Sequence, residues 1–207
     1  MSLTVVLVVL VPLLLFGWLI GQAMPTPRDR QLERLRTRAR TLQLHVTLRM
    51  LPDPDPEPGQ RVSSGGVVRE PKLEVAAYTL PLRLPRELDK RHAPSWSVAR
   101  MRQHDEEVYA EGLSAGWRLQ RAEVSLQPGI LATLSELLAR TPRGTVTLEA
   151  SARDVTLCWR ERGGDEEVDA IAALLEDVAA FQTARAREAA GQEARADAQP
   201  GQDAPEE

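Results

Sequence analysis

The feature that most constrains this chain is an uncharged, apolar run near its start, residues 3–20. As an α-helix, a run of this length would span about 27 Å, close to the roughly 30 Å hydrocarbon core of a bilayer. A proline is tolerated within a membrane span, and a tryptophan near its end suits the headgroup level. The run therefore predicts a transmembrane anchor over residues 1–22, marked by Leu3, Pro12, Trp18 and Ile20.

Two other interpretations of the run are weaker. A cleavable signal peptide would use the small residues at 21–23, but no Lys or Arg precedes the run. The run also exceeds the roughly 7 to 15 residues usual for the apolar part of a signal peptide. A buried core helix is disfavoured because soluble domains seldom contain so long a helix that is apolar all round.

The residues after the run set its predicted orientation. Residues 24–51 carry seven arginines and two carboxylates, a local net charge of +5. The positive-inside bias places such a segment in the cytoplasm, with the N-terminus outside. Because Lys72 and Lys90 are the only lysines, the composition suggests a GC-rich bacterial genome. We therefore expect a single-pass protein of the bacterial inner membrane, with a periplasmic N-terminus and a cytoplasmic C-terminal domain.

Residues 23–51 are predicted to form a basic juxtamembrane helix and a strand. Thr26 and Pro27 are a favourable helix start, and the helix should run to about Leu42. Three arginines stack on one helix face at intervals of four, which suits contact with anionic lipid headgroups or a solvated face that signals topology. Alternation over residues 44–50 then predicts a half-buried strand. The stacked arginines are Arg30, Arg34 and Arg38.

A Pro/Asp/Gly-rich segment, residues 52–71, interrupts these patterns. It favours an extended linker between two domains or a long loop within one domain. It includes Gly59, Val62, Gly65 and Gly66. Following an anchor and an Arg-rich helix, these residues resemble the Gly-x-x-Val-x-x-Gly-Gly segment of the YajC family of preprotein translocase accessory subunits. That resemblance implies an accessory role at a translocase, whereas a glycine pair by itself indicates a turn.

The similarity to that family covers about the first third of the chain. The present sequence continues far beyond the family's compact domain, and its Pro/Asp run interrupts the spacing between the basic region and the glycines. The overall layout, including residues 157–163, also resembles single-pass proteobacterial proteins, which implies no function.

Residues 72–184 are predicted to form an α+β domain. One or two strands are expected within 72–84, with Pro81 ending the first or confining it to a sheet edge, and further strands at 96–102 and 117–120. A helix over 128–140, a hairpin of strands at 145–150 and 155–160, and a helix starting at Asp165 should follow. The full prediction is an N-terminal transmembrane helix followed by a two-layer cytoplasmic domain with a largely antiparallel sheet and two packed helices. The remainder, residues 185–207, is predicted to be a disordered acidic tail.

The sequence offers few residues for chemistry. His45, His92 and His104 lack the spacing of a metal site, and the acid–base appearance of residues 104–107 suits a solvated loop better. Cys158 is expected to be a small apolar filler or an exposed thiol. We therefore predict no catalytic, cofactor-binding or metal-binding residue. Three tryptophans are expected in the core or at its edge, not in a ligand cage: Trp96, Trp117 and Trp159.

These patterns favour a non-enzymatic, membrane-tethered interaction module that acts as an adaptor or accessory subunit of an inner-membrane complex. The expected partners are a membrane protein and anionic lipid headgroups. Nucleic acid is not expected, because the formal net charge is -4. The alternatives are a YajC-like translocase subunit and an enzyme with an unrecognised site in the α+β domain.

Overall fold

The computed structural model describes residues 26–54, 56, 66–68, 70–88, 90–101, 113–114, 116–123 and 126–197. The chain divides into two compact units, Met1–Arg34 and Leu35–Glu207. The boundary falls within the first described helix, α2 (Pro27–Thr41). That helix begins as predicted: Thr26 Oγ1 accepts the Asp29 N–H at 3.2 Å, and Asp29 Oδ2 accepts the Thr26 N–H at 2.9 Å. This reciprocal pair is a capping box.

The predicted anchor, with Leu3, Pro12, Trp18 and Ile20, lies outside the described residues. Within the described ranges, no helix combines the length and the apolar character that crossing a bilayer requires. The longest, α4 (Asp165–Asp197), carries charged residues along its 33 positions and has only one apolar stripe. The prediction of an N-terminal transmembrane helix, and with it the single-pass, inner-membrane placement, is therefore corrected.

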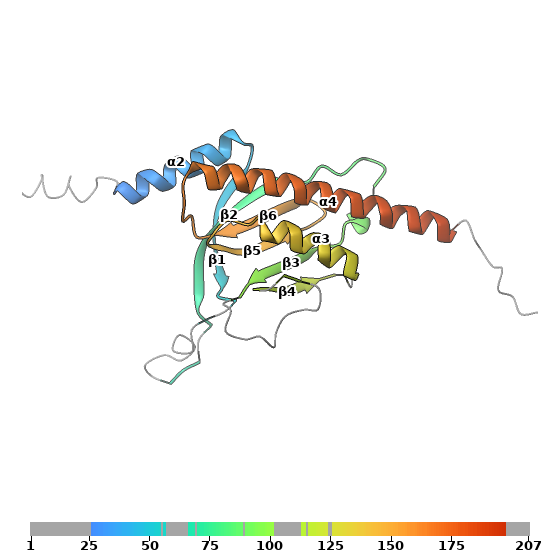
Figure 1. Ribbon diagram of the computed structural model, residues 1–207, viewed down its shortest axis with the longest axis horizontal. Helices are drawn as coiled ribbons and strands as arrows, with labels where there is room; N and C mark the ends of the chain where they lie inside the picture. Colours follow the sequence, from blue (N-terminus) through green and yellow to red (C-terminus); the bar gives the residue numbers. More distant parts are fainter. Residues whose placement is uncertain are drawn as a thin grey trace, which may run out of the picture. The chain divides into compact units, whose positions relative to one another are not determined.

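Six strands form one sheet in the order β1-β2-β6-β5-β3-β4 (Figure 1). Every pair of neighbours is antiparallel. Besides α2 and α4, the described helices are a short 3-10 turn, η2 (Lys90–His92), and α3 (Pro128–Ala139). The strands are β1 (His45–Pro52), β2 (Lys72–Pro81), β3 (Trp96–Arg100), β4 (Trp117–Ala122), β5 (Thr145–Ala150) and β6 (Asp154–Trp159).

The Pro/Asp/Gly-rich segment connects two paired strands. Pro52 of β1 lies opposite Lys72 of β2, and the Asp53 N–H donates to the Pro71 carbonyl at 2.8 Å. The segment is therefore a loop within the sheet. Sequence could not choose between a loop and a linker, because the choice depends on pairing between strands on either side of the segment.

Helices α3 and α4 lie over one face of the sheet (Figure 1). Between residues 168 and 178 of α4, every third or fourth residue is apolar and buried, so one stripe of the helix contacts the sheet. The three tryptophans expected at the core are also buried. Removing this apolar surface from water is the main favourable term in folding of the unit. The stripe consists of Val168, Ile171, Leu174, Leu175 and Val178.

The opposite face of the sheet holds a small second cluster: Val75, Ala77, Val146 and Cys158. In a regular strand over 145–150 Val146 would share a face with Leu148, but the two lie on opposite faces. The β5–β6 register shifts between Thr145 and Thr147, so Val146 is the extra residue of a β-bulge. Successive side chains of a strand point to opposite faces of the sheet. One inserted residue therefore moves a side chain to the other face.

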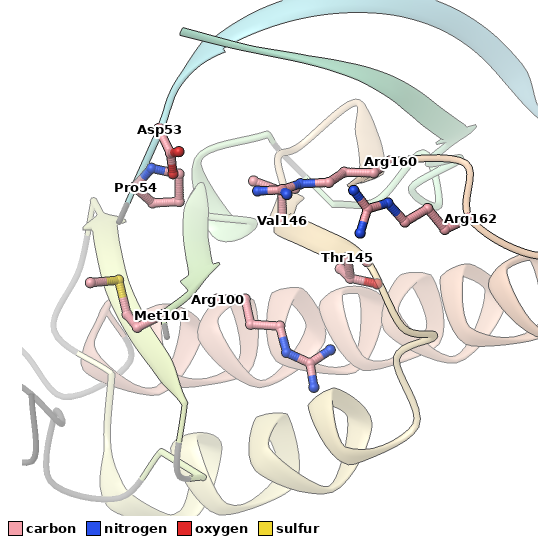
Figure 2. Close-up of a pocket in the computed structure, with 9 residues that line it drawn as sticks. Asp53, Pro54, Arg100, Met101, Thr145, Val146, Arg160 and Arg162 are labelled. Carbon is pink, nitrogen blue, oxygen red and sulfur yellow. The ribbon is translucent and has the colours of Figure 1, made fainter. Parts of the chain in front are cut away.

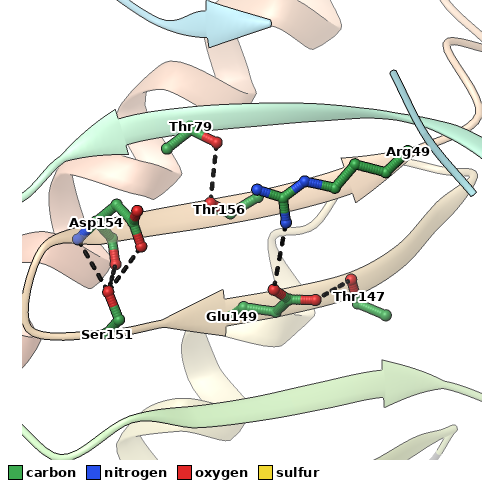
Figure 3. A network of polar contacts seen from close by, with 7 residues as sticks. All are labelled: Arg49, Thr79, Thr147, Glu149, Ser151, Asp154 and Thr156. Carbon is green, nitrogen blue, oxygen red and sulfur yellow. Dashed lines mark hydrogen bonds and ion pairs between the residues drawn. The ribbon is translucent and has the colours of Figure 1, made fainter. Parts of the chain in front are cut away.

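An ion pair spans this second face. Arg49 Nη1 lies 3.7 Å from Glu149 Oε2, and the Thr147 hydroxyl donates to Glu149 Oε1 at 3.2 Å (Figure 3). Arg49 belongs to β1 and Glu149 to β5, so the contact extends over β2 and β6. Ala77 and Cys158, paired on the two intervening strands, are small side chains of this face.

Helix α4 continues past the predicted end near residue 184 and ends at Asp197. The disordered tail predicted over residues 185–207 is therefore corrected for 185–197, and the rest lies outside the described ranges. The extension is rich in alanine and arginine, which favour helix. It is also held by tertiary contacts: Ala186 is buried, and Glu193 Oε2 lies 2.6 Å from His92 Nε2.

The buried Gln182 provides a test of α4 packing. Its Oε1 accepts the Trp96 Nε1–H at 2.9 Å, and its Nε2 donates to the Pro94 carbonyl at 2.9 Å. We predict that Gln182→Met, of similar volume, lowers the free energy of unfolding by about 1–3 kcal/mol, because buried polar groups lose their partners. Urea denaturation measures the change. Arg187→Gln, on the exposed side of α4, is the control and should match the wild type.

Candidate anion-binding pocket

A pocket of about 230 Å³ opens at one end of the sheet (Figure 2). Strands β1, β3 and β6 end at this edge, and β5 begins there, because neighbouring strands are antiparallel. Residues distant in sequence therefore meet in one place. The lining residues are Asp53, Pro54, Arg100, Met101, Gly144, Thr145, Val146, Arg160 and Arg162.

Three arginines dominate the electrostatics of the pocket. Arg160 and Arg162 extend into it from the chain that follows β6 (Figure 2). Arg100, at the end of β3, holds its guanidinium over the Trp117 ring, 5.7 Å from the ring centroid. Among the described lining residues Asp53 is the only carboxylate, so the lining carries a net positive charge. Within the described ranges, neither Arg160 nor Arg162 forms an ion pair.

The residue between these two arginines is turned into the protein. Glu161 is 5% exposed and has a left-handed backbone, φ 48°. Its carboxylate accepts hydrogen bonds from Arg36 Nε at 3.0 Å and from Arg36 Nη2 at 2.6 Å. It also accepts one from the Tyr78 hydroxyl at 3.1 Å. With Glu161 held inward, Arg160 and Arg162 are left to project the other way, into the pocket. The buried ion pair thus positions the arginines.

In the Arg36–Glu161–Tyr78 cluster, the pKa values of Arg36 and Tyr78 are also raised. Burial, and then the nearby Glu161 carboxylate, raise the pKa of Tyr78 far above its usual value. The hydrogen bond to Glu161 raises the pKa of Arg36. Arg36 and Tyr78 therefore keep their protons across the ordinary pH range.

The structure does not gather the arginines predicted to face lipid. Arg38 pairs with Asp169 of α4, Nε to Oδ1 at 2.8 Å, and this contact lowers the pKa of Asp169. Arg30 and Arg34 are exposed residues of the N-terminal unit. A role for all three at lipid headgroups therefore remains a prediction from sequence, and one of them already has a protein partner.

The other residues considered for chemistry lie elsewhere. His45 is exposed on β1, and His104 with the acidic residues after it falls outside the described residues. Cys158 is buried on the second face of the sheet, as the filler interpretation expected. Among the residues that the structure describes, no cluster of His, Cys, Asp or Glu could hold a metal ion.

Sequence reasoning missed the arginine pocket. A signal was present, because arginines flank a glutamate directly after a predicted strand. Their meeting with Arg100, sixty residues earlier in the chain, depends on strand order and could not be seen.

Comparisons with protein-family models, with curated proteins and with solved structures find no match. Guanidinium groups donate paired hydrogen bonds to carboxylates and phosphates. A partly enclosed site with a net positive lining suits an anionic group on a ligand.

The anchoring role of Glu161 can be measured as stability. We predict that Glu161→Gln lowers the free energy of unfolding by roughly 2–4 kcal/mol, because it leaves the Arg36 charge without its partner. Arg36 keeps some access to water, which limits the loss. Arg38→Gln, which breaks the exposed ion pair with Asp169, is the matched control and should leave stability near the wild type. Equal effects of the two substitutions in urea denaturation would contradict the prediction.

Cys158 gives a prediction on reactivity. Burial raises the pKa of its thiol to about 11. At pH 8 the native chain should react only slowly with iodoacetamide, and urea should release full reactivity. As pH rises above about 8.5, the unfolded thiol ionises while the native one does not, so this group favours unfolding at alkaline pH.

Mass spectrometry of a Thr37→Cys variant supplies an internal control, because Thr37 is exposed on α2. One adduct should form quickly and the second only after unfolding. Two quick adducts in the native state would show that Cys158 is accessible.

Proposed function

We propose that this chain is a non-enzymatic interaction module that binds an acidic segment of a partner protein in the arginine pocket. The observation that carries the proposal is that Arg100, Arg160 and Arg162 line one pocket, in which Asp53 is the only carboxylate among the described lining residues. Two of these arginines lack an ion-pair partner within the described part of the chain. An acidic side chain of a partner would supply one.

The lining supports binding better than catalysis. General acid–base chemistry needs a group whose protonation can change during the reaction, usually His, Asp, Glu, Lys, Tyr or Cys. Asp53 is the only such group among the described lining residues, and the arginines stay protonated. The lining arginines therefore suit the binding of an anion better than general acid–base catalysis.

A carboxylate ligand is favoured over nucleic acid by the charge of the whole molecule. Nucleic-acid binding draws on many phosphate contacts spread over a basic surface. Here the formal net charge is -4, and the cationic groups of the pocket are confined to one end of the sheet. A short acidic segment fits this local positive charge without requiring a basic surface.

Fluorescence anisotropy with a labelled glutamate-rich peptide tests the proposal. The Arg160→Gln/Arg162→Gln variant should bind the peptide at least about tenfold more weakly, because charge-assisted hydrogen bonds are worth about 1.5–3 kcal/mol. Added salt should weaken binding to the wild type.

Arg187→Gln removes an exposed positive charge from α4 and is the control for net charge. It should bind like the wild type. Equal losses in the two variants would show non-specific attraction, and tighter binding of duplex DNA than of the peptide would overturn the choice of ligand.

A further inference from the structure

Strand β1 forms one edge of the sheet, since β2 is its only neighbour among the described strands. Unlike most large apolar side chains in the described ranges, two on this strand face solvent: Leu48 is 54% exposed and Met50 is 59% exposed. The alternation over residues 44–50 predicts that the apolar face of this strand is buried, and for Leu48 and Met50 that prediction was wrong. An apolar edge strand is a template for pairing with another chain.

The register of β1 shows which backbone groups face outward. Asp53 donates its N–H to Pro71, so its backbone points toward β2. In an antiparallel ladder, alternate residues point to the same neighbour, and the β1–β2 register is continuous. Arg49 and Thr47 therefore also bond toward β2. The N–H and C=O groups of Val46, Leu48 and Met50 point away from β2, toward the open edge.

The open edge leads into the arginine pocket. Asp53 and Pro54 directly follow β1, and both line the pocket beside Arg160. A segment lying along β1 would therefore have one end beside Asp53 and Pro54, at the mouth of the arginine pocket. The apolar edge strand and its outward backbone groups thus lead to two residues that line the positively charged pocket.

We propose that the acidic partner segment binds as an added strand along β1, with apolar side chains against Leu48 and Met50 and acidic side chains in the arginine pocket. The binding of acidic side chains in the pocket rests on the proposed function, and the pairing of the segment with β1 goes beyond it. Main-chain hydrogen bonds supply affinity in such strand addition, and alternate side chains supply specificity.

A second copy of β1 is a poorer occupant of this edge. Residues 45–52 contain His45 and Arg49 but no carboxylate. Pairing two copies of β1 would add positive charge beside a positive pocket. A partner strand that ends in acidic residues offsets that charge.

The test uses a labelled peptide with alternating valine and threonine followed by glutamates. Amide hydrogen exchange, measured by NMR on the wild-type chain, reports directly whether the peptide pairs with β1. Bound peptide should slow exchange of the Val46, Leu48 and Met50 amides at least about tenfold. The amides of Thr47 and Arg49 should change little, because β2 already protects them.

Leu48→Pro and Leu48→Thr separate the backbone contribution from the apolar one. Proline at this position removes an outward N–H without breaking the β1–β2 ladder, and should weaken binding about tenfold. Leu48→Thr keeps the N–H and should lose less affinity. Urea denaturation confirms that both variants are folded, and the exchange result on the wild type holds even if one is not.

The outcomes distinguish the two proposals. Binding that depends on Arg160 and Arg162 but leaves the three β1 amides unprotected would overturn strand addition and keep the acidic site. No detectable binding of the peptide would overturn both. Protection of the same amides without peptide, increasing with protein concentration, would show that a second copy occupies the edge.

Discussion

The buried contact between Arg36 and Glu161 is the interaction on which the candidate site depends. It joins the C-terminal part of α2 to the chain that leaves β6, and it holds Glu161 in a left-handed backbone conformation that a non-glycine residue rarely adopts. An isolated residue in that conformation costs free energy. The bidentate ion pair and the Tyr78 hydrogen bond offset this cost, and the neighbouring arginines are thereby directed into the pocket.

The two faces of the sheet are stabilised differently. One face is covered by α3 and α4, whose apolar stripes bury the large side chains. The other has small side chains at its centre, and the Arg49–Glu149 pair extends over them. The β-bulge at Val146 contributes to this second face and lies beside the pocket, where bulges often redirect side chains. The pocket therefore sits where the regular sheet ends.

Several elements were predictable because their signals are local. Three such signals are the apolar spacing of α4, the proline and glycine at the ends of α3, and the alternation in β6. Each indicates helix or strand from a few neighbouring residues. The structure shows α3 at Pro128–Ala139 and a β5–β6 hairpin where these signals placed them. The predicted burial of Leu48 and Met50 was wrong because alternation gives a face but not what covers it.

The sequence by itself determined the positions of α3 and of most strands, and the start and apolar stripe of α4, because side-chain periodicity and turn residues act over one or two turns of chain. Only the tertiary structure decided the strand order, the bulge at Val146 and the inward turn of Glu161. The bulge depends on the register of β5 against β6, the strand order on pairs such as Ala76 with Trp159, and the inward turn of Glu161 on a contact with Arg36, 125 positions earlier. The meeting of Arg100 with Arg160 and Arg162 follows from that pairing, so the candidate site belongs to the fold and not to any one segment.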